Sequence, residues 1–216
     1  MNFPNESAKY RSSRKELLKA ELALRRQIEK VAALRRKLPP GGEVPQDYVF
    51  TSATGPVKLS ELFGRGNTLV AYSFMYGPDM KHACPMCTSF LDGLNGNAQH
   101  VAQRTNLAVI AKSPAVRILE YGRGRGWNNL RLLSSAGTTY NRDYHGETEK
   151  GAQMPMMNVF VKKDRKVRHF YGSELLYAPE DKGQNARHND LMWSLWNVLD
   201  LTPEGRGNDW YPKLAY

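Results

Sequence analysis

The sequence predicts an α/β domain, a central mixed β-sheet flanked by helices, preceded by a basic amphipathic helical arm. From residue 48 onward, apolar β-rich runs alternate with helix-compatible segments, which is typical of a sheet with helices on its faces. The last two runs, at 156–162 and 166–171, flank a short polar turn and indicate an antiparallel edge. Residues 1–42 differ in pattern and form the arm with its Pro/Gly linker, and residues 43–216 form the domain.

The length and composition exclude several classes of protein. A chain of 216 residues suits one domain with an appendage and needs neither disulfides nor a metal to hold its core. Apolar residues make up 41% of the chain, which argues against disorder, and no apolar run approaches the ~18 residues of a membrane span. The first thirty residues lack the apolar centre of a secretory signal, so we expect a cytoplasmic protein with no membrane partner.

The arm is the first expected element, a helix of about twenty-five residues. Ser12 or Ser13 can cap its start, and the PPGG run at 39–42 ends it. Residues 1–40 carry a net charge of +7, against +3 for the rest of the chain. Apolar side chains recur every seven residues along one face, at Leu17, Leu24, Val31 and Leu38. We expect this face to pack on its own domain or on a second subunit, as a homodimer. Nucleic acid is a less favoured partner because no aromatic side chains are interleaved among the charges.

The first half of the domain is expected to begin with strands. Two short strands at 48–50 and 57–63, the second running into a helical turn, precede a buried strand at 68–76. A helix over 85–104, weakened by two glycines, leads to an apolar strand at 107–111.

The second half continues the alternation. Ser113 and Pro114 predict a helix start with proline in the first helical position, and Gly122 ends that helix. A strand at 130–134 and the hairpin follow, and Asn189 can cap a last helix that runs to about Leu199. We expect the tryptophans of this helix, Trp193 and Trp196, to pack in the core.

The two cysteines of the chain, Cys84 and Cys87, stand where a predicted strand gives way to a predicted helix. With Cys84 beside the N-cap and Pro85 at the first helical position, the Cys84 sulfur faces unpaired backbone N–H groups. These donors and the helix dipole lower a cysteine pKa from ~8.5 to about 3.5–7.5. Lys81 and His82 add positive charge nearby and are candidates for tuning the thiolate.

This placement predicts dithiol–disulfide exchange with a protein or small-molecule substrate. Cys84 would attack a substrate disulfide, and Cys87, one helical turn later, would resolve the mixed disulfide without any bound cofactor. The alternative to a redox-active pair is two buried thiols that do not react. We expect no metal site, because such a site needs about four ligands and only His82 stands near the pair in sequence. The covalent haem pattern is also absent, since Thr88 follows Cys87.

The order of elements around the CPMC segment, followed by Met154, Pro155 and an apolar strand, resembles the thioredoxin fold. The resemblance implies that Pro155 is a cis-proline whose loop, with Met154, lies against the cysteines and leaves a backbone edge free for a substrate chain. We expect Met154, Pro155 and Pro85 to contact the substrate. An ordinary proline at the start of a strand is the alternative. The segment TGPVKLSELF also resembles the opening of the peroxiredoxin-like and TlpA-like branch of that fold.

Over nearly its whole length the chain resembles the DUF899 family of predicted thioredoxin-like dithiol–disulfide oxidoreductases. Four segments carry this resemblance: YRSSRKELLKAELALRRQIEKVAALRRKLPPGG, FMYGPDMKHACPMC, SSAGTTYNRDY and LWNVLDLTPEGRGNDWYPKL. The chain departs from thioredoxin itself because Ala83, not tryptophan, precedes Cys84, and because about seven residues separate the strand from Cys84. This spacing leaves room for an extra loop over the site.

Two other functions remain as alternatives. In a peroxiredoxin-like thiol peroxidase, Cys84 would attack a peroxide and become a sulfenic acid, with which Cys87 would condense. The peroxiredoxin pattern PxxxTxxC fails here twice: Pro78 lies six residues before Cys84, and His82 stands where the threonine is required. In the second alternative the chain is a non-enzymatic interaction module that uses the basic arm, and its cysteines are vestigial.

Overall fold

The computed structural model describes residues 1–64, 66–182, 192–204, 207 and 211–215. The chain divides into two compact units, Met1–Pro39 and Pro40–Tyr216. The first unit contains helix α1 (Ala8–Arg36), which begins earlier than predicted because Ser7 caps it and accepts a hydrogen bond from the backbone N–H of Tyr10. None of the α1 side chains is buried. The homodimer that this helix is expected to form stays a prediction.

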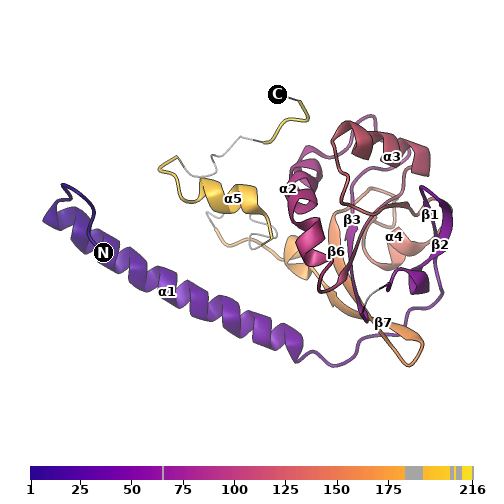
Figure 1. Ribbon diagram of the computed structural model, residues 1–216, viewed down its shortest axis with the longest axis horizontal. Helices are drawn as coiled ribbons and strands as arrows, with labels where there is room; N and C mark the ends of the chain where they lie inside the picture. Colours follow the sequence, from indigo (N-terminus) through magenta and orange to yellow (C-terminus); the bar gives the residue numbers. More distant parts are fainter. Residues whose placement is uncertain (65, 183–191, 205–206, 208–210, 216) are drawn as a thin grey trace. The chain divides into compact units, whose positions relative to one another are not determined.

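The second unit is built on a mixed sheet, which in the described residues has seven strands in the order β2-β1-β5-β4-β3-β6-β7 (Figure 1). The strands β3, β4 and β5 are parallel to one another, and the strands on either side of them are antiparallel to their neighbours. The bounds are β1 (Val49–Ser52), β2 (Gly55–Lys58), β3 (Thr68–Ser73), β4 (Asn106–Ala111), β5 (Leu132–Ser134), β6 (Met156–Lys163) and β7 (Lys166–Gly172).

Helices connect the parallel strands, as parallel pairing requires. Helix α2 (Pro85–Val101) joins β3 to β4, and α3 (Ala115–Gly124) joins β4 to β5. Figure 1 shows α5 (Ser194–Leu199) beside α2, and the two helices are in contact. The shorter elements are α4 (Tyr140–Asp143) and the 3₁₀ turns η1 (Leu59–Glu61) and η2 (Glu174–Tyr177). This topology, with the cysteine pair at the start of the helix after β3, confirms the thioredoxin-like α/β fold predicted from the sequence.

The side chains of β3 alternate between two hydrophobic clusters, one on each face of the sheet. Tyr72 joins the cluster beneath α2, α3 and α5, which also contains Cys87 and the predicted core residues Trp193 and Trp196. Ala71 joins the opposite cluster, which β1, η1 and α4 cover. Because both faces are covered, the centre of the sheet is buried. It forms a rigid surface on which the start of α2 packs.

One local expectation was wrong, another lies outside the described residues, and one short helix was not predicted. Pro114 is the N-cap of α3 and not its first helical residue, because the buried Ser113 hydroxyl donates a hydrogen bond to the Gly77 carbonyl oxygen and does not cap the helix. The short helix α4 has no counterpart in the prediction. Asn189, expected to cap the last helix, lies outside the described residues, and α5 begins at Ser194.

Two features are absent from the part of the chain that the structure describes. None of its helices is both long enough and apolar enough to cross a membrane. Within the same residues, His, Cys, Asp and Glu side chains form no group of three that could hold a metal ion.

Candidate active site

Cys84 occupies the N-cap of α2, and Pro85 is the first residue of the helix. The backbone N–H of Cys84 donates a hydrogen bond of 3.1 Å to the carbonyl oxygen of Met75, just beyond the end of β3. The backbone N–H of Cys87 points back to the Cys84 sulfur at 3.4 Å. The strand-to-helix turn therefore aims the unpaired donors of the first helical turn at this sulfur, as the sequence predicts.

The pKa of Cys84 is lowered to about 6 by the hydrogen-bond donors around its sulfur. The largest contribution is a hydrogen bond from the Cys87 thiol, and the backbone N–H groups of Cys87 and Met86 add to it. Burial opposes the shift, because a charged sulfur loses solvation there. At neutral pH Cys84 is therefore mainly a thiolate, and its side chain is only partly buried, so a reactant can reach it.

The Cys87 side chain is 1% exposed. Burial raises its pKa well above the ordinary value, and the neighbouring Cys84 raises it further. Hydrogen bonds from the Tyr72 hydroxyl and the Met75 backbone N–H act in the opposite direction. Both thiols are free. The site thus pairs a partly accessible thiolate with a buried thiol that donates a hydrogen bond to it.

Lys81 and His82 belong to the loop that leads into the site, and both side chains are exposed. Charge on an exposed side chain is screened by solvent, and the groups that lower the pKa of Cys84 are the Cys87 thiol and two backbone N–H groups. The tuning role expected of Lys81 and His82 stays a prediction.

Arg117 of α3 holds the same loop. Its guanidinium donates hydrogen bonds to four carbonyl oxygens, those of Gly77, Pro78, Met80 and Lys81. It also lies over the ring of Tyr76, with 4.4 Å between the guanidinium carbon and the ring centroid. One side chain thus fixes the backbone between β3 and Cys84.

The expectation of a cis-proline is wrong, because no peptide bond among the described residues is cis and Pro155 is one of them. The Met154–Pro155 bond has the trans form, which X–Pro bonds ordinarily favour by about 0.5–1 kcal/mol. The N–H of Met154 donates to the Gly146 carbonyl oxygen at 2.9 Å, and the carbonyl oxygen of Pro155 accepts from the Tyr177 hydroxyl at 2.5 Å. The Met154 N–H and the Pro155 carbonyl oxygen are therefore engaged within the protein.

The loop nevertheless reaches the same end of the sheet as the cysteines. Met156, which follows Pro155, pairs with Ser73 at the end of β3. Burial raises the pKa of Tyr177 to about 12, and the nearby Cys87 contributes to that rise. Tyr177 therefore connects the Pro155 loop to the surroundings of Cys87. The substrate contact expected of Met154, Pro155 and Pro85 stays a prediction.

Three residues around the cysteines were not predicted from the sequence: Tyr72, Arg117 and Tyr177. For Tyr72 a signal existed, because strand alternation places it on the face of β3 that packs against α2. Arg117 and Tyr177 act through contacts with segments 22 or more positions away, and no local pattern marks such contacts.

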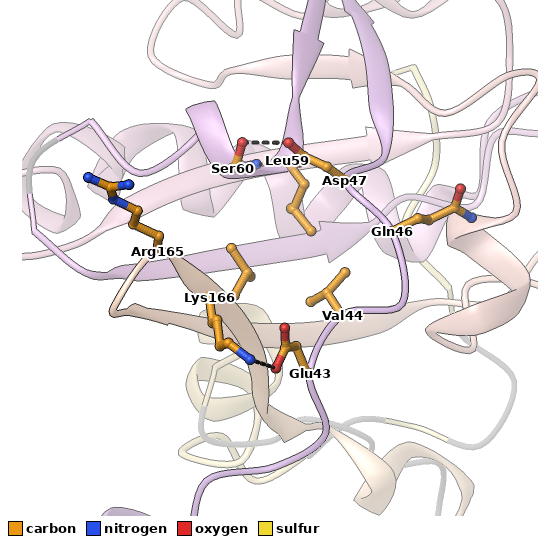
Figure 2. Close-up of a pocket in the computed structure, with 9 residues that line it drawn as sticks. Glu43, Val44, Gln46, Asp47, Leu59, Ser60, Arg165 and Lys166 are labelled. Carbon is orange, nitrogen blue, oxygen red and sulfur yellow. Dashed lines mark hydrogen bonds and ion pairs between the residues drawn. The ribbon is translucent and has the colours of Figure 1, made fainter.

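A hollow of about 170 Å³ lies between the first residues of the domain and the β6–β7 hairpin (Figure 2). Its acidic groups are paired: Glu43 contacts Lys166 at 3.0 Å and Arg168 at 3.2 Å, and Asp47 accepts hydrogen bonds from the backbone N–H and the hydroxyl of Ser60. These contacts tie the chain after the linker to the hairpin. Neither cysteine lines this hollow. The candidate site is therefore separate from it and lies at the cysteine pair.

A comparison with known families and structures gives a family and distant structural likenesses. The family described as "Bacterial protein of unknown function (DUF899)" matches residues 1–216. None of the curated proteins matches the chain.

Two solved structures illustrate the likeness. Peroxidoxin BcpB from Mycobacterium tuberculosis is 18% identical with a TM-score of 0.45, covering 75% of this chain and 98% of that one. A cysteine-to-serine mutant of PrxQ from Xylella fastidiosa is 12% identical with a TM-score of 0.49, covering 74% of this chain and 97% of that one. At these identities the likeness concerns the fold and not the activity.

Proposed function

The chain belongs to the DUF899 family, and we propose that it is a dithiol–disulfide oxidoreductase in which Cys84 attacks and Cys87 resolves. The observation that carries this proposal is the placement of two free cysteines at the start of α2, with Cys84 at the N-cap and the Cys87 backbone N–H 3.4 Å from its sulfur. One sulfur is an accessible thiolate with a pKa of about 6, and the other is a buried thiol directed at it.

The reaction follows from this arrangement in two steps. The Cys84 thiolate attacks one sulfur of a substrate disulfide, so that a Cys84–substrate disulfide forms and the other substrate sulfur leaves as a thiolate. Cys87 then loses its proton to solvent or to a leaving thiolate and attacks the Cys84 sulfur. A Cys84–Cys87 disulfide forms, and the second substrate sulfur leaves. The substrate gains two electrons and the protein loses two, so no bound cofactor takes part.

The substrate class is a disulfide or thiol, carried by a protein or a small molecule. The partly buried Met154 and Pro155 border the end of the sheet where Cys84 lies, and we propose that they contact the bound substrate. Because the Met154 N–H and the Pro155 carbonyl oxygen are already engaged, we propose that this contact uses side-chain surface and not strand pairing.

The test mixes the reduced full-length protein with oxidised glutathione and follows the products by mass spectrometry. We expect the wild-type chain to lose two hydrogens and form the Cys84–Cys87 disulfide with release of glutathione. Cys87→Ser should stop at a glutathione adduct on Cys84, and Cys84→Ser should not react at a comparable rate. An adduct on Cys87, or a wild-type chain that stays reduced, would contradict the proposal.

Hydrogen peroxide in a parallel reaction distinguishes the peroxidase alternative. If stoichiometric, micromolar peroxide oxidises Cys84 much faster than the disulfide does, the assignment to dithiol–disulfide exchange is wrong. We expect the disulfide to react faster.

A further inference from the structure

The Cys87 sulfur is surrounded by groups suited to a negative charge, although the reduced protein keeps Cys87 as a neutral thiol. Tyr72 and Cys87 lie in the same buried cluster beneath α2, and the Tyr72 hydroxyl and the Met75 backbone N–H act on this sulfur as hydrogen-bond donors that lower the pKa of Cys87. The titratable side chains that face it, among the described residues, are Cys84, Tyr72 and Tyr177. The described surroundings of Cys87 thus supply two hydrogen-bond donors.

Tyr72 is held rigidly in this position. It lies in the middle of the sheet, where β3 pairs it with Val109 of β4 and Met157 of β6. Its side chain is 1% exposed, and its ring packs on Phe90 of α2 with 4.8 Å between ring centroids. Burial and the cysteine pair raise the pKa of Tyr72 well above its ordinary value, so its hydroxyl keeps its proton and stays a donor.

The effect of these donors depends on the state of Cys84. In the reduced protein the Cys87 thiol donates a hydrogen bond to the Cys84 thiolate. The negative charge of that thiolate disfavours ionisation of Cys87 and so raises the pKa of Cys87. Once Cys84 is part of a mixed disulfide it is neutral, and that opposition ends. The donors from Tyr72 and Met75 remain and favour the Cys87 thiolate.

We propose that Tyr72 is a catalytic hydrogen-bond donor that stabilises the Cys87 thiolate in the resolving step. This proposal rests on the proposed function, because it concerns the second step of the same exchange. The proton leaves Cys87 for solvent or for the substrate thiolate, the Cys87 sulfur bonds to the Cys84 sulfur, and the substrate sulfur leaves with the electron pair of the broken disulfide. Tyr72 keeps its own proton throughout.

The experiment separates the two steps with dithiobis(nitrobenzoate), an aromatic disulfide that releases a coloured thiolate. With one equivalent of reagent, a first release reports the attack by Cys84, and a second release reports resolution by Cys87. In Tyr72→Phe we expect the first phase to be unchanged and the second to be about tenfold slower at neutral pH, as expected for the loss of a hydrogen bond to a charged group. The pH midpoint of the second phase should also rise by about one unit.

The control is Tyr140→Phe, which makes the same chemical change in the opposite cluster, where the buried Tyr140 hydroxyl has no hydrogen-bond partner among the described residues. Both phases should match the wild type in this variant. A second phase that is unchanged in Tyr72→Phe, in both rate and pH midpoint, would overturn the role of Tyr72. A wild-type chain with no second phase would instead overturn the proposed function, so the two failures are distinguishable.

A second variant keeps the inference testable if Tyr72→Phe does not fold, which the loss of the first phase would reveal. A fluorinated tyrosine placed at position 72 retains the ring and has a more acidic hydroxyl, which is a stronger donor. We expect a faster second phase with an unchanged first phase. A second phase that is no faster than in the wild type would contradict the proposal.

Discussion

The hydroxyl of Tyr177 donates a hydrogen bond of 2.5 Å to the carbonyl oxygen of Pro155. Tyr177 is the last residue of η2, which follows β7, and Pro155 directly precedes β6. The bond therefore ties the segment after the hairpin to the loop before it, at the end of the sheet where β3 leads towards Cys84. In this protein the loop beside the cysteines is fixed by a side chain.

The first prediction concerns that bond. Tyr177→Phe should lower the free energy of unfolding by about 0.5 kcal/mol, the lower end of the usual contribution of one hydrogen bond, because the Tyr177 side chain is 43% exposed and water competes for the bond; urea unfolding measures the change. Tyr211→Phe is the control, because the Tyr211 side chain is 59% exposed. Equal stability of the two variants would show that the Tyr177 bond contributes nothing.

The second prediction concerns the origin of the low pKa of Cys84. Because the Cys87 thiol makes the largest contribution, Cys87→Ala should raise the pKa of Cys84 from about 6 towards its ordinary value. Cys87→Ser keeps a donor at this position and should raise it less. The pH dependence of alkylation by iodoacetamide measures both shifts. A midpoint that stays near 6 in Cys87→Ala would assign the shift to the backbone N–H groups alone.

The third prediction is a pH dependence of stability in the reduced protein. The folded-state pKa of Cys84 is about 6, whereas an unfolded cysteine titrates near ~8.5, so the folded chain holds fewer protons between these values. The free energy of unfolding should therefore rise from about pH 6 to about pH 8.5, by at most about 1.4 kcal/mol per pH unit. This contribution is lost as the pH falls through 6.

The shift of Cys87 has the opposite sign and acts in a different window. Its raised pKa lowers stability only above the pKa of an unfolded cysteine, near ~8.5, where it opposes the gain from Cys84. Urea unfolding under reducing conditions at several pH values, compared with Cys84→Ser, isolates the Cys84 contribution. If the difference between the two proteins does not change with pH, the Cys84 thiolate is not stabilised by the fold.

The fourth prediction concerns the loop before Cys84. Arg117→Lys replaces a planar donor fork with a single ammonium group, which cannot reach four carbonyl oxygens in the same geometry. We expect the attack of Cys84 on dithiobis(nitrobenzoate) to slow several-fold. Arg123→Ala, an exposed change on the same helix, should leave that rate unaltered. An unaltered rate in Arg117→Lys would mean that the loop does not depend on this side chain.

Local patterns predicted much of the fold because they act over short distances. Alternating and β-branched runs located the strands of the domain, and Pro85 marked the first residue of α2. The start of α1 was misplaced because three serines, at positions 7, 12 and 13, are each able to cap a helix, and Ser7 does so. The short helix α4 was missed because its position depends on burial of Tyr140 in the core.

The site was predictable only where its residues are close in sequence. The spacing of Cys84 and Cys87 at a helix start was enough to predict a thiolate beside a second thiol. The groups around Cys87 come from different elements: Tyr72 from the strand before the helix and Tyr177 from a turn after the hairpin. The conformation of Pro155 was predicted wrongly because only the resemblance suggested the cis form, whereas the bond before Pro155 has the trans form that X–Pro bonds ordinarily favour.

The most direct test of the whole account is a redox titration of the full-length protein in glutathione buffers of graded potential, with peptide mapping of the thiols and disulfides. We expect a reversible two-electron transition between two free thiols and a Cys84–Cys87 disulfide within one chain. Thiols that stay reduced at every potential, or disulfides that form only between chains, would contradict it.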